Sequence, residues 1–139
     1  IPIFGAAMKA MGALPIERRN RQKVMEIYKE AEVRVAKGEV FALAPESTRQ
    51  AGRGGLGDFK LGPFFFSVNS KMPVVPVVIS HCEKVLPKHG VWINKERWFQ
   101  TVTVEFLDPI LPDGYTEDNL SDLRTLAKDR MLTALKNRY

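Results

Sequence analysis

The stretch that decides the fold runs from residue 40 to residue 49 and reads VFALAPESTR. Five apolar residues come first, and four polar residues follow directly after Pro45. An apolar run of this length that ends at a turn residue is typical of a buried strand, so we expect a strand at 40–44. The loop at its carboxyl end would then carry Glu46, Ser47, Thr48 and Arg49. Ligands bind at that edge of open α/β sheets, so this loop is the first candidate site.

The composition is that of one folded domain, residues 1–139, with 45% hydrophobic and 27% charged residues. The net charge of +5 is spread along the chain, which favours a small anion or an anionic membrane surface over nucleic acid. No apolar stretch approaches about 18 residues, so no transmembrane helix is predicted. The single cysteine, Cys82, cannot form an internal disulfide, and without a secretory signal we expect the cytosolic side.

Three segments have the apolar spacing of helices. The first covers residues 21–37, with Asn20 as a plausible N-cap and Gly38 as the stop. Residues 61–68 are expected to form a buried helix or a strongly apolar surface, and a last helix is predicted from about 118 to 137.

Two segments are expected to be strands. Residues 72–79 are β-branched and apolar on both faces, as in parallel sheets, although Pro73 and Pro76 restrict pairing. Residues 101–106 alternate like a half-buried strand near an edge. Strands that alternate with helices predict a single α/β domain, with a mostly parallel central sheet flanked by helices.

Two arginines at strand ends are the groups best suited to hold an anion. Arg49 would offer a planar fork of donors to phosphate or carboxylate, and the Ser47 and Thr48 hydroxyls would add neutral donors. Glu46 would orient that arginine or cap a neighbouring turn. Arg18 follows a short strand, so the two arginines could together neutralise a phosphate. The alternatives are an ordinary surface loop and, for Arg18, a surface side chain.

Residues 52–57 match the pattern G-x-G-x-x-G, but they lie too far beyond the predicted strand for a dinucleotide fold. No Walker lysine-serine pair follows, so a flexible loop or lid near the site is the favoured role. His81 and Cys82 are neighbours whose side chains would point to opposite sides of an extended chain. With His89 elsewhere, the sequence offers no metal-ligand spacing, and we expect no metal.

Three segments resemble ordered blocks of the glycerolipid acyltransferase family, of the lysophosphatidic acid acyltransferase type. They are Gly12-x-x-x-Ile16-x-Arg18, PESTR at 45–49 and PVVPV at 73–77, which match G-x-I-F-I-x-R, F-P-E-G-T-R and V-P-V-V-P-V. Phe59-Lys60-x-Gly62 between the last two also fits. Ser47 departs from the family pattern, because it stands where the family has glycine.

The family's first block, H-x-x-x-x-D, is absent from these residues. Leu86 stands five residues after His81, and Asn94 stands five after His89. Since that block precedes the others in the family, we expect a glycerol-3-phosphate acyltransferase-like fold that lacks its N-terminal portion. The chain would then contain no catalytic residue of its own.

The resemblance implies transfer of a fatty acyl group from acyl-CoA or acyl-carrier protein to 1-acylglycerol 3-phosphate, which forms phosphatidate in phospholipid biosynthesis. It implies no cofactor and a membrane-associated protein on the cytoplasmic face. The acceptor's phosphate would lie among Arg18, Glu46, Ser47, Thr48 and Arg49. Two alternatives stay open: a noncatalytic lipid-phosphate-binding relative, and a nucleotide-binding α/β enzyme that uses residues 52–57.

Overall fold

The computed structural model describes residues 10–14, 20–48, 55–85, 99 and 101–138. The chain falls into two compact units, residues 1–42 and 43–139. In the described part of the chain, no helix has the length and apolar character needed to cross a bilayer.

The first unit contains helix α2 (Arg21–Val35), which begins and ends close to where the sequence predicts. The Asn20 side chain accepts a hydrogen bond from the Lys23 backbone N–H at 3.2 Å, so it caps one of the free donors of the first turn. After the helix, Gly38 adopts a φ of +90°, which lets the chain turn away. The prediction of this helix with both end signals is confirmed.

Arg34, near the end of α2, ties the segments of this unit together. Its guanidinium donates to the Glu39 carboxylate at 2.6 and 2.8 Å and to the Gly12 carbonyl oxygen at 3.0 Å. It also lies 5.0 Å from the centre of the Phe41 ring. The hydrogen bond from Arg34 lowers the pKa of the Glu39 carboxyl. One planar cation thus organises the chain around the end of the helix.

The strand predicted at 40–44 is not formed, and this prediction is wrong. The segment has no regular secondary structure, Val40 is 85% exposed and Leu43 is 37% exposed. A strand needs a neighbour for its backbone N–H and C=O groups, and none of the described residues forms a ladder with this segment. The polar loop therefore follows an irregular segment.

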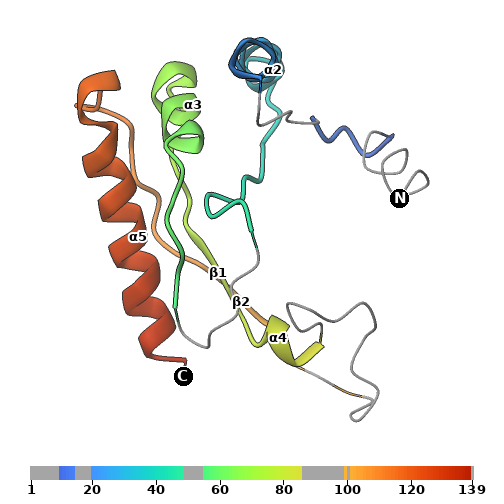
Figure 1. The fold of residues 1–139 in the computed structure, drawn as a ribbon, viewed down its shortest axis with the longest axis vertical. Coiled ribbons are helices and arrows are strands. Elements are labelled where there is room, and N and C mark those ends of the chain that lie inside the picture. Colours follow the sequence, from blue (N-terminus) through green and yellow to red (C-terminus); the bar gives the residue numbers. More distant parts are fainter. Residues whose placement is uncertain (1–9, 15–19, 49–54, 86–98, 100, 139) are drawn as a thin grey trace. The chain divides into compact units, whose positions relative to one another are not determined.

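The described residues of the second unit form two longer helices and two short strands. Helix α3 (Gly62–Ser70) has Pro63 in its first turn, and helix α5 (Leu120–Lys136) follows one 3₁₀ turn, η1 (Glu117–Asn119). Strand β1 (Val77–Ser80) leads into the short helix α4 (Cys82–Val85), and strand β2 (Thr103–Phe106) comes later. Helix α5 packs against both α3 and β1 (Figure 1).

The core of this unit gathers around Leu123 of α5, which is completely buried. The other buried members of the cluster are Phe59, Phe64, Ile110, Leu120 and Ala127. The Phe59 and Phe64 rings stack with their centres 6.3 Å apart. Of the two alternatives predicted for 61–68, a buried helix or a strongly apolar surface, the helix is confirmed, since Phe64 and Phe66 of α3 are buried.

The two strands pair antiparallel, with Val78 opposite Glu105 and Ser80 opposite Thr103. Val74 and Ile110 form a further antiparallel bridge, and the Pro76 carbonyl accepts from the Leu107 N–H at 2.9 Å. The α/β character is as predicted, but the pairing of segment 72–79 among the described residues is antiparallel, where a parallel sheet was expected. Apolar residues on both faces of a strand indicate burial and do not fix the direction of its neighbour.

The two faces of this strand pair differ in exposure. Val78 and Ser80 are each 2% exposed, whereas Ile79, Val104 and Phe106 on the other face are 55%, 51% and 72% exposed. The predicted edge strand at 101–106 is confirmed as a strand over 103–106, although its apolar side chains are the exposed ones.

Replacement of Leu123 by alanine should lower the free energy of unfolding by about 2–5 kcal/mol, because it opens a cavity at the centre of the core. The matched change Leu111→Ala, at a side chain that is 60% exposed, should cost less than about 1 kcal/mol. Urea denaturation of the protein measures both. Equal losses would mean that Leu123 is not at the centre of the core.

Candidate functional site

The polar loop is closed at its base by two hydrogen bonds. The Glu46 Oε2 accepts from the Gly57 backbone N–H at 2.6 Å, and the Pro45 carbonyl accepts from the Lys60 backbone N–H at 2.9 Å. The segment 45–46 therefore lies beside the segment 57–60, and the chain between them leaves and returns at adjoining points. We call this pair of contacts the loop base.

The Glu46 carboxylate accepts its hydrogen bond from the backbone of the segment that returns from the loop. Its side chain is partly buried, and a carboxylate that accepts from a backbone N–H makes a strong charge-assisted hydrogen bond. A negative side chain would also repel a phosphate. Glu46 is therefore suited to position the loop and not to touch an anionic ligand.

Ser47 has a φ of +58°, in the left-handed region that favours glycine. Its backbone N–H donates to the Ala44 carbonyl at 3.2 Å, which is the hydrogen bond of a tight turn. A residue with a Cβ in this conformation costs about 1 kcal/mol. The glycine of the family pattern at this position thus has a backbone reason, and Ser47 occupies the same turn at some cost.

The structure describes three of the five predicted site residues, and these three follow one another directly. Thr48 is exposed beyond the turn. Arg18 and Arg49 lie outside the described residues, so their pairing around a phosphate stays a prediction.

Of the glycine-rich pattern at 52–57, the structure describes the last three residues. The backbone N–H of Gly57 is already bonded to Glu46. In this structure the last glycine of the pattern therefore serves the loop base.

His81 and Cys82 take no part in this loop base. His81 has a φ of +67° directly after β1, and the exposed Cys82 begins α4. His89 lies outside the described residues. Within the described ranges, no three His, Cys, Asp or Glu side chains come together in a group that could hold a metal ion.

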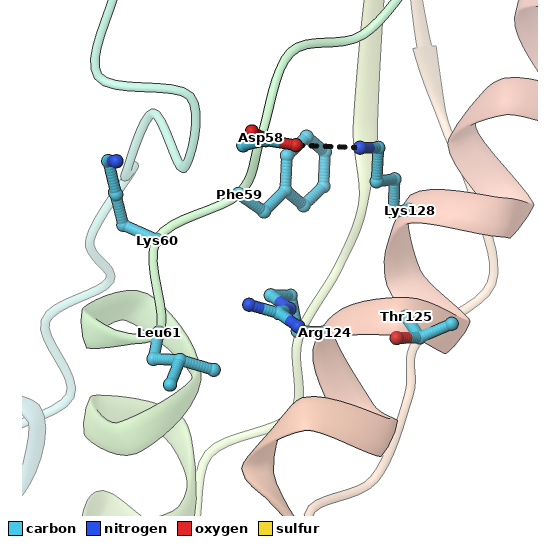
Figure 2. Close-up of a pocket in the computed structure, with 7 residues that line it drawn as sticks. All are labelled: Asp58, Phe59, Lys60, Leu61, Arg124, Thr125 and Lys128. Carbon is cyan, nitrogen blue, oxygen red and sulfur yellow. Dashed lines mark ion pairs between the residues drawn. The ribbon is translucent and has the colours of Figure 1, made fainter.

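A groove of about 530 Å³ lies directly beside the loop base (Figure 2). One wall is the segment 58–61, which follows Gly57, and the other is α5. We call it the basic groove, and its lining residues are Asp58, Phe59, Lys60, Leu61, Arg124, Thr125 and Lys128. Three of these are cations and one is a carboxylate.

Arg124 and Lys128 line the basic groove but were not among the candidate site residues predicted from the sequence. The only signal was a pair of basic residues four positions apart on the last helix, which is equally typical of a solvent-exposed helix face. Lys60 was noticed only as part of the pattern Phe59-Lys60-x-Gly62.

The fold and the loop base define an α/β protein that presents hydroxyl groups on a closed turn next to a basic groove. The sequence model of the Acyltransferase family matches residues 1–80, which is more than half of the chain. The chain therefore belongs to the Acyltransferase family.

Named relatives agree with this membership. The chain is 34% identical over 133 residues to a 1-acyl-sn-glycerol-3-phosphate acyltransferase of Haemophilus influenzae, across 94% of this chain and 52% of the relative. It is 28% identical over 139 residues to the enzyme of the same name from Saccharomyces cerevisiae, across 98% of this chain and 44% of that one. The chain thus spans about half the length of the curated relatives it matches.

A solved structure is similar as well. The crystal structure of PlsC from Thermotoga maritima, a 1-acyl-sn-glycerophosphate acyltransferase, superimposes with a TM-score of 0.59 at 27% identity. The match covers 81% of this chain and 45% of that chain.

Replacement of Glu46 by alanine should speed hydrogen exchange of the Gly57 amide by about tenfold, because a charge-assisted hydrogen bond is lost. Glu46→Gln keeps a side-chain oxygen and should leave much of the protection. The Val78 amide in β1 serves as the internal control. Unchanged exchange at Gly57 in the alanine variant would contradict the loop base.

Replacement of Ser47 by valine should lower the free energy of unfolding by at least about 1 kcal/mol, because a β-branched residue is strained at positive φ. Ser47→Gly should change it by less than about 1 kcal/mol, since relief of strain offsets the greater freedom of the unfolded chain. Urea denaturation measures both, with Thr48→Val as the control outside the left-handed region. Equal effects of valine at 47 and 48 would refute the argument.

Proposed function

We propose that the protein transfers a fatty acyl group from a thioester, acyl-CoA or acyl-carrier protein, to the free hydroxyl of 1-acylglycerol 3-phosphate. The product is phosphatidate, for phospholipid biosynthesis. The observation that carries this proposal is that a member of the Acyltransferase family places the first four residues of its PESTR block, 45–48, on a turn closed by Glu46 and Gly57. The names of the relatives from bacteria and yeast support the acceptor.

In this proposal the chain supplies the grip on the acceptor. Arg18 and Arg49 neutralise the phosphate, and the hydroxyls of Ser47 and Thr48 donate to its oxygens. Glu46 does not contact the phosphate, and its role is to position the turn that carries these hydroxyls.

The chemistry itself needs a base for the acceptor hydroxyl. As the proton leaves, the oxygen attacks the thioester carbonyl, the new C–O bond replaces the C–S bond, and the thiol takes up the proton. The 139 residues contain no H-x-x-x-x-D block, and the chain spans about half of its relatives. We therefore assign the base and its aspartate partner to the rest of the protein. The thioester is already activated, so the reaction needs no cofactor.

The same proposal places the protein at the cytoplasmic face of a membrane, because its acceptor and product are both lipids. It also includes a larger, mostly parallel central sheet in the complete protein, to which the antiparallel pair of β1 and β2 would belong.

One rival is a noncatalytic relative that binds lipid phosphates, and the absence of the H-x-x-x-x-D block from these residues favours it. Acyl transfer by the purified protein decides between the two. Binding of lysophosphatidate without any turnover would establish the rival. Nucleotide binding through residues 52–57 is disfavoured, because the Gly57 N–H is already bonded.

Replacement of Arg49 by alanine should lower kcat/KM for the lysophosphatidate acceptor by about a hundredfold, because two hydrogen bonds between charged groups are lost. The donor's KM should stay unchanged. Arg49→Lys keeps the positive charge but lacks the planar pair of donors. Its kcat/KM for the acceptor should lie between those of the unchanged protein and of Arg49→Ala. Arg130→Ala, which removes a cation of α5 outside the loop base, is the control. Normal acceptor kinetics in Arg49→Ala would remove Arg49 from the phosphate site.

A further inference from the structure

The basic groove holds cations that the loop base does not use. We propose that it binds the phosphate groups of the acyl donor's carrier, coenzyme A or the phosphopantetheine arm of a carrier protein. The inference deepens the proposed function and rests on it. Four features of the groove support it.

The first feature is an excess of positive charge that the groove does not neutralise. Asp58 is its only carboxylate, and one oxygen lies 3.7 Å from the Lys128 ammonium. The Asp58 side chain is 99% exposed, so this ion pair is weak. The charge of the lining residues therefore favours an anion over a cation.

The second feature is an arginine that has no hydrogen-bond or ion-pair partner among the described residues. Arg124 is partly buried, and it makes no hydrogen bond or ion pair with any other residue in the described ranges. Figure 2 shows its side chain reaching from α5 toward segment 58–61. A guanidinium has five N–H donors in a rigid fork that matches phosphate oxygens. This side chain is therefore ready for an incoming phosphate.

The third feature is that the two cations on α5 belong to a helix that is packed against the core. Arg124 and Lys128 are four residues apart on a helix whose neighbouring residues Leu123 and Ala127 are buried in the core. The Lys128 ammonium lies 5.8 Å from the centre of the Phe59 ring, which is itself 4% exposed. Binding would therefore require little movement of the backbone that carries these two cations.

The fourth feature is the shape and place of the groove. The groove has a volume of about 530 Å³ and its arginine is partly buried, whereas a flat membrane surface reaches protruding side chains. Lys60 lines the groove, and its backbone N–H belongs to the loop base. A ligand in the groove would thus lie next to the turn proposed for the acceptor, as the second substrate must.

The binding test is isothermal titration calorimetry, in which coenzyme A is added to the full protein and its dissociation constant is measured. Arg124→Gln and Lys128→Gln should each weaken binding by about tenfold, because each removes a hydrogen bond between charged groups. Arg124→Lys should restore part of the affinity. Lys136→Gln, which removes an exposed cation farther along α5, is the matched control and should bind like the unchanged protein. Thermal unfolding of each variant shows that the fold is retained.

The kinetic test separates the possible sources of phosphate. In Arg124→Gln, the KM for the donor should rise about tenfold and the KM for lysophosphatidate should not change. A rise with both acyl-CoA and acyl-carrier protein assigns the groove to the shared phosphopantetheine phosphate. A rise with acyl-CoA alone assigns it to the nucleotide phosphates.

Other outcomes overturn the inference. They are a rise in the KM for lysophosphatidate instead of the donor, unchanged coenzyme A binding in all variants, and a loss of binding to anionic phospholipid vesicles with coenzyme A binding unchanged. If the protein binds coenzyme A through the groove but transfers no acyl group to any acceptor, the proposed function fails and the groove assignment stands.

Discussion

The arrangement of the second unit depends on the burial of Leu123 among the apolar side chains of α3, α5 and the segment before α3. Phe59 is the member of this cluster that connects the core to the site. The backbone N–H of Lys60, which follows Phe59, donates to the Pro45 carbonyl. The backbone N–H of Gly57, two residues before Phe59, donates to the Glu46 carboxylate. The hydrophobic burial of one ring therefore holds the returning side of the polar loop in place. The geometry of the site is an outcome of core packing.

Charges around this core are divided between two tasks. The carboxylate of Glu46 is bonded to the backbone, so the polar turn carries no free negative side chain from that residue. The cations of the basic groove stand on α5 and on the segment after the loop. In the proposed function, a phosphorylated acceptor and a phosphorylated carrier would have to lie close together. The polar turn and the basic groove adjoin at Lys60, so each could hold one of the two.

Structural features that depend only on residues adjacent in the sequence, such as the ends of helices, were predicted well. Asn20 and Gly38 marked the ends of α2 because capping and left-handed turns are local properties. The strand expected at 40–44 failed because a strand depends on a partner that periodicity does not reveal. The antiparallel direction of β1 was hidden for the same reason. The loop base joins residues 11 positions apart, and the basic groove joins segments from the two ends of the second unit, so neither could be read from spacing.

The ion pair between Asp58 and Lys128 has a consequence for selectivity. The Asp58 side chain is 99% exposed and lies 3.7 Å from the Lys128 ammonium, so an entering anion can displace it from that cation at little cost. A monovalent ion such as chloride would replace one single charge by another and gain little. A phosphate group brings more charge and more oxygens, and it could engage Arg124 as well. In the proposed role, the groove would therefore discriminate between anions by their valence.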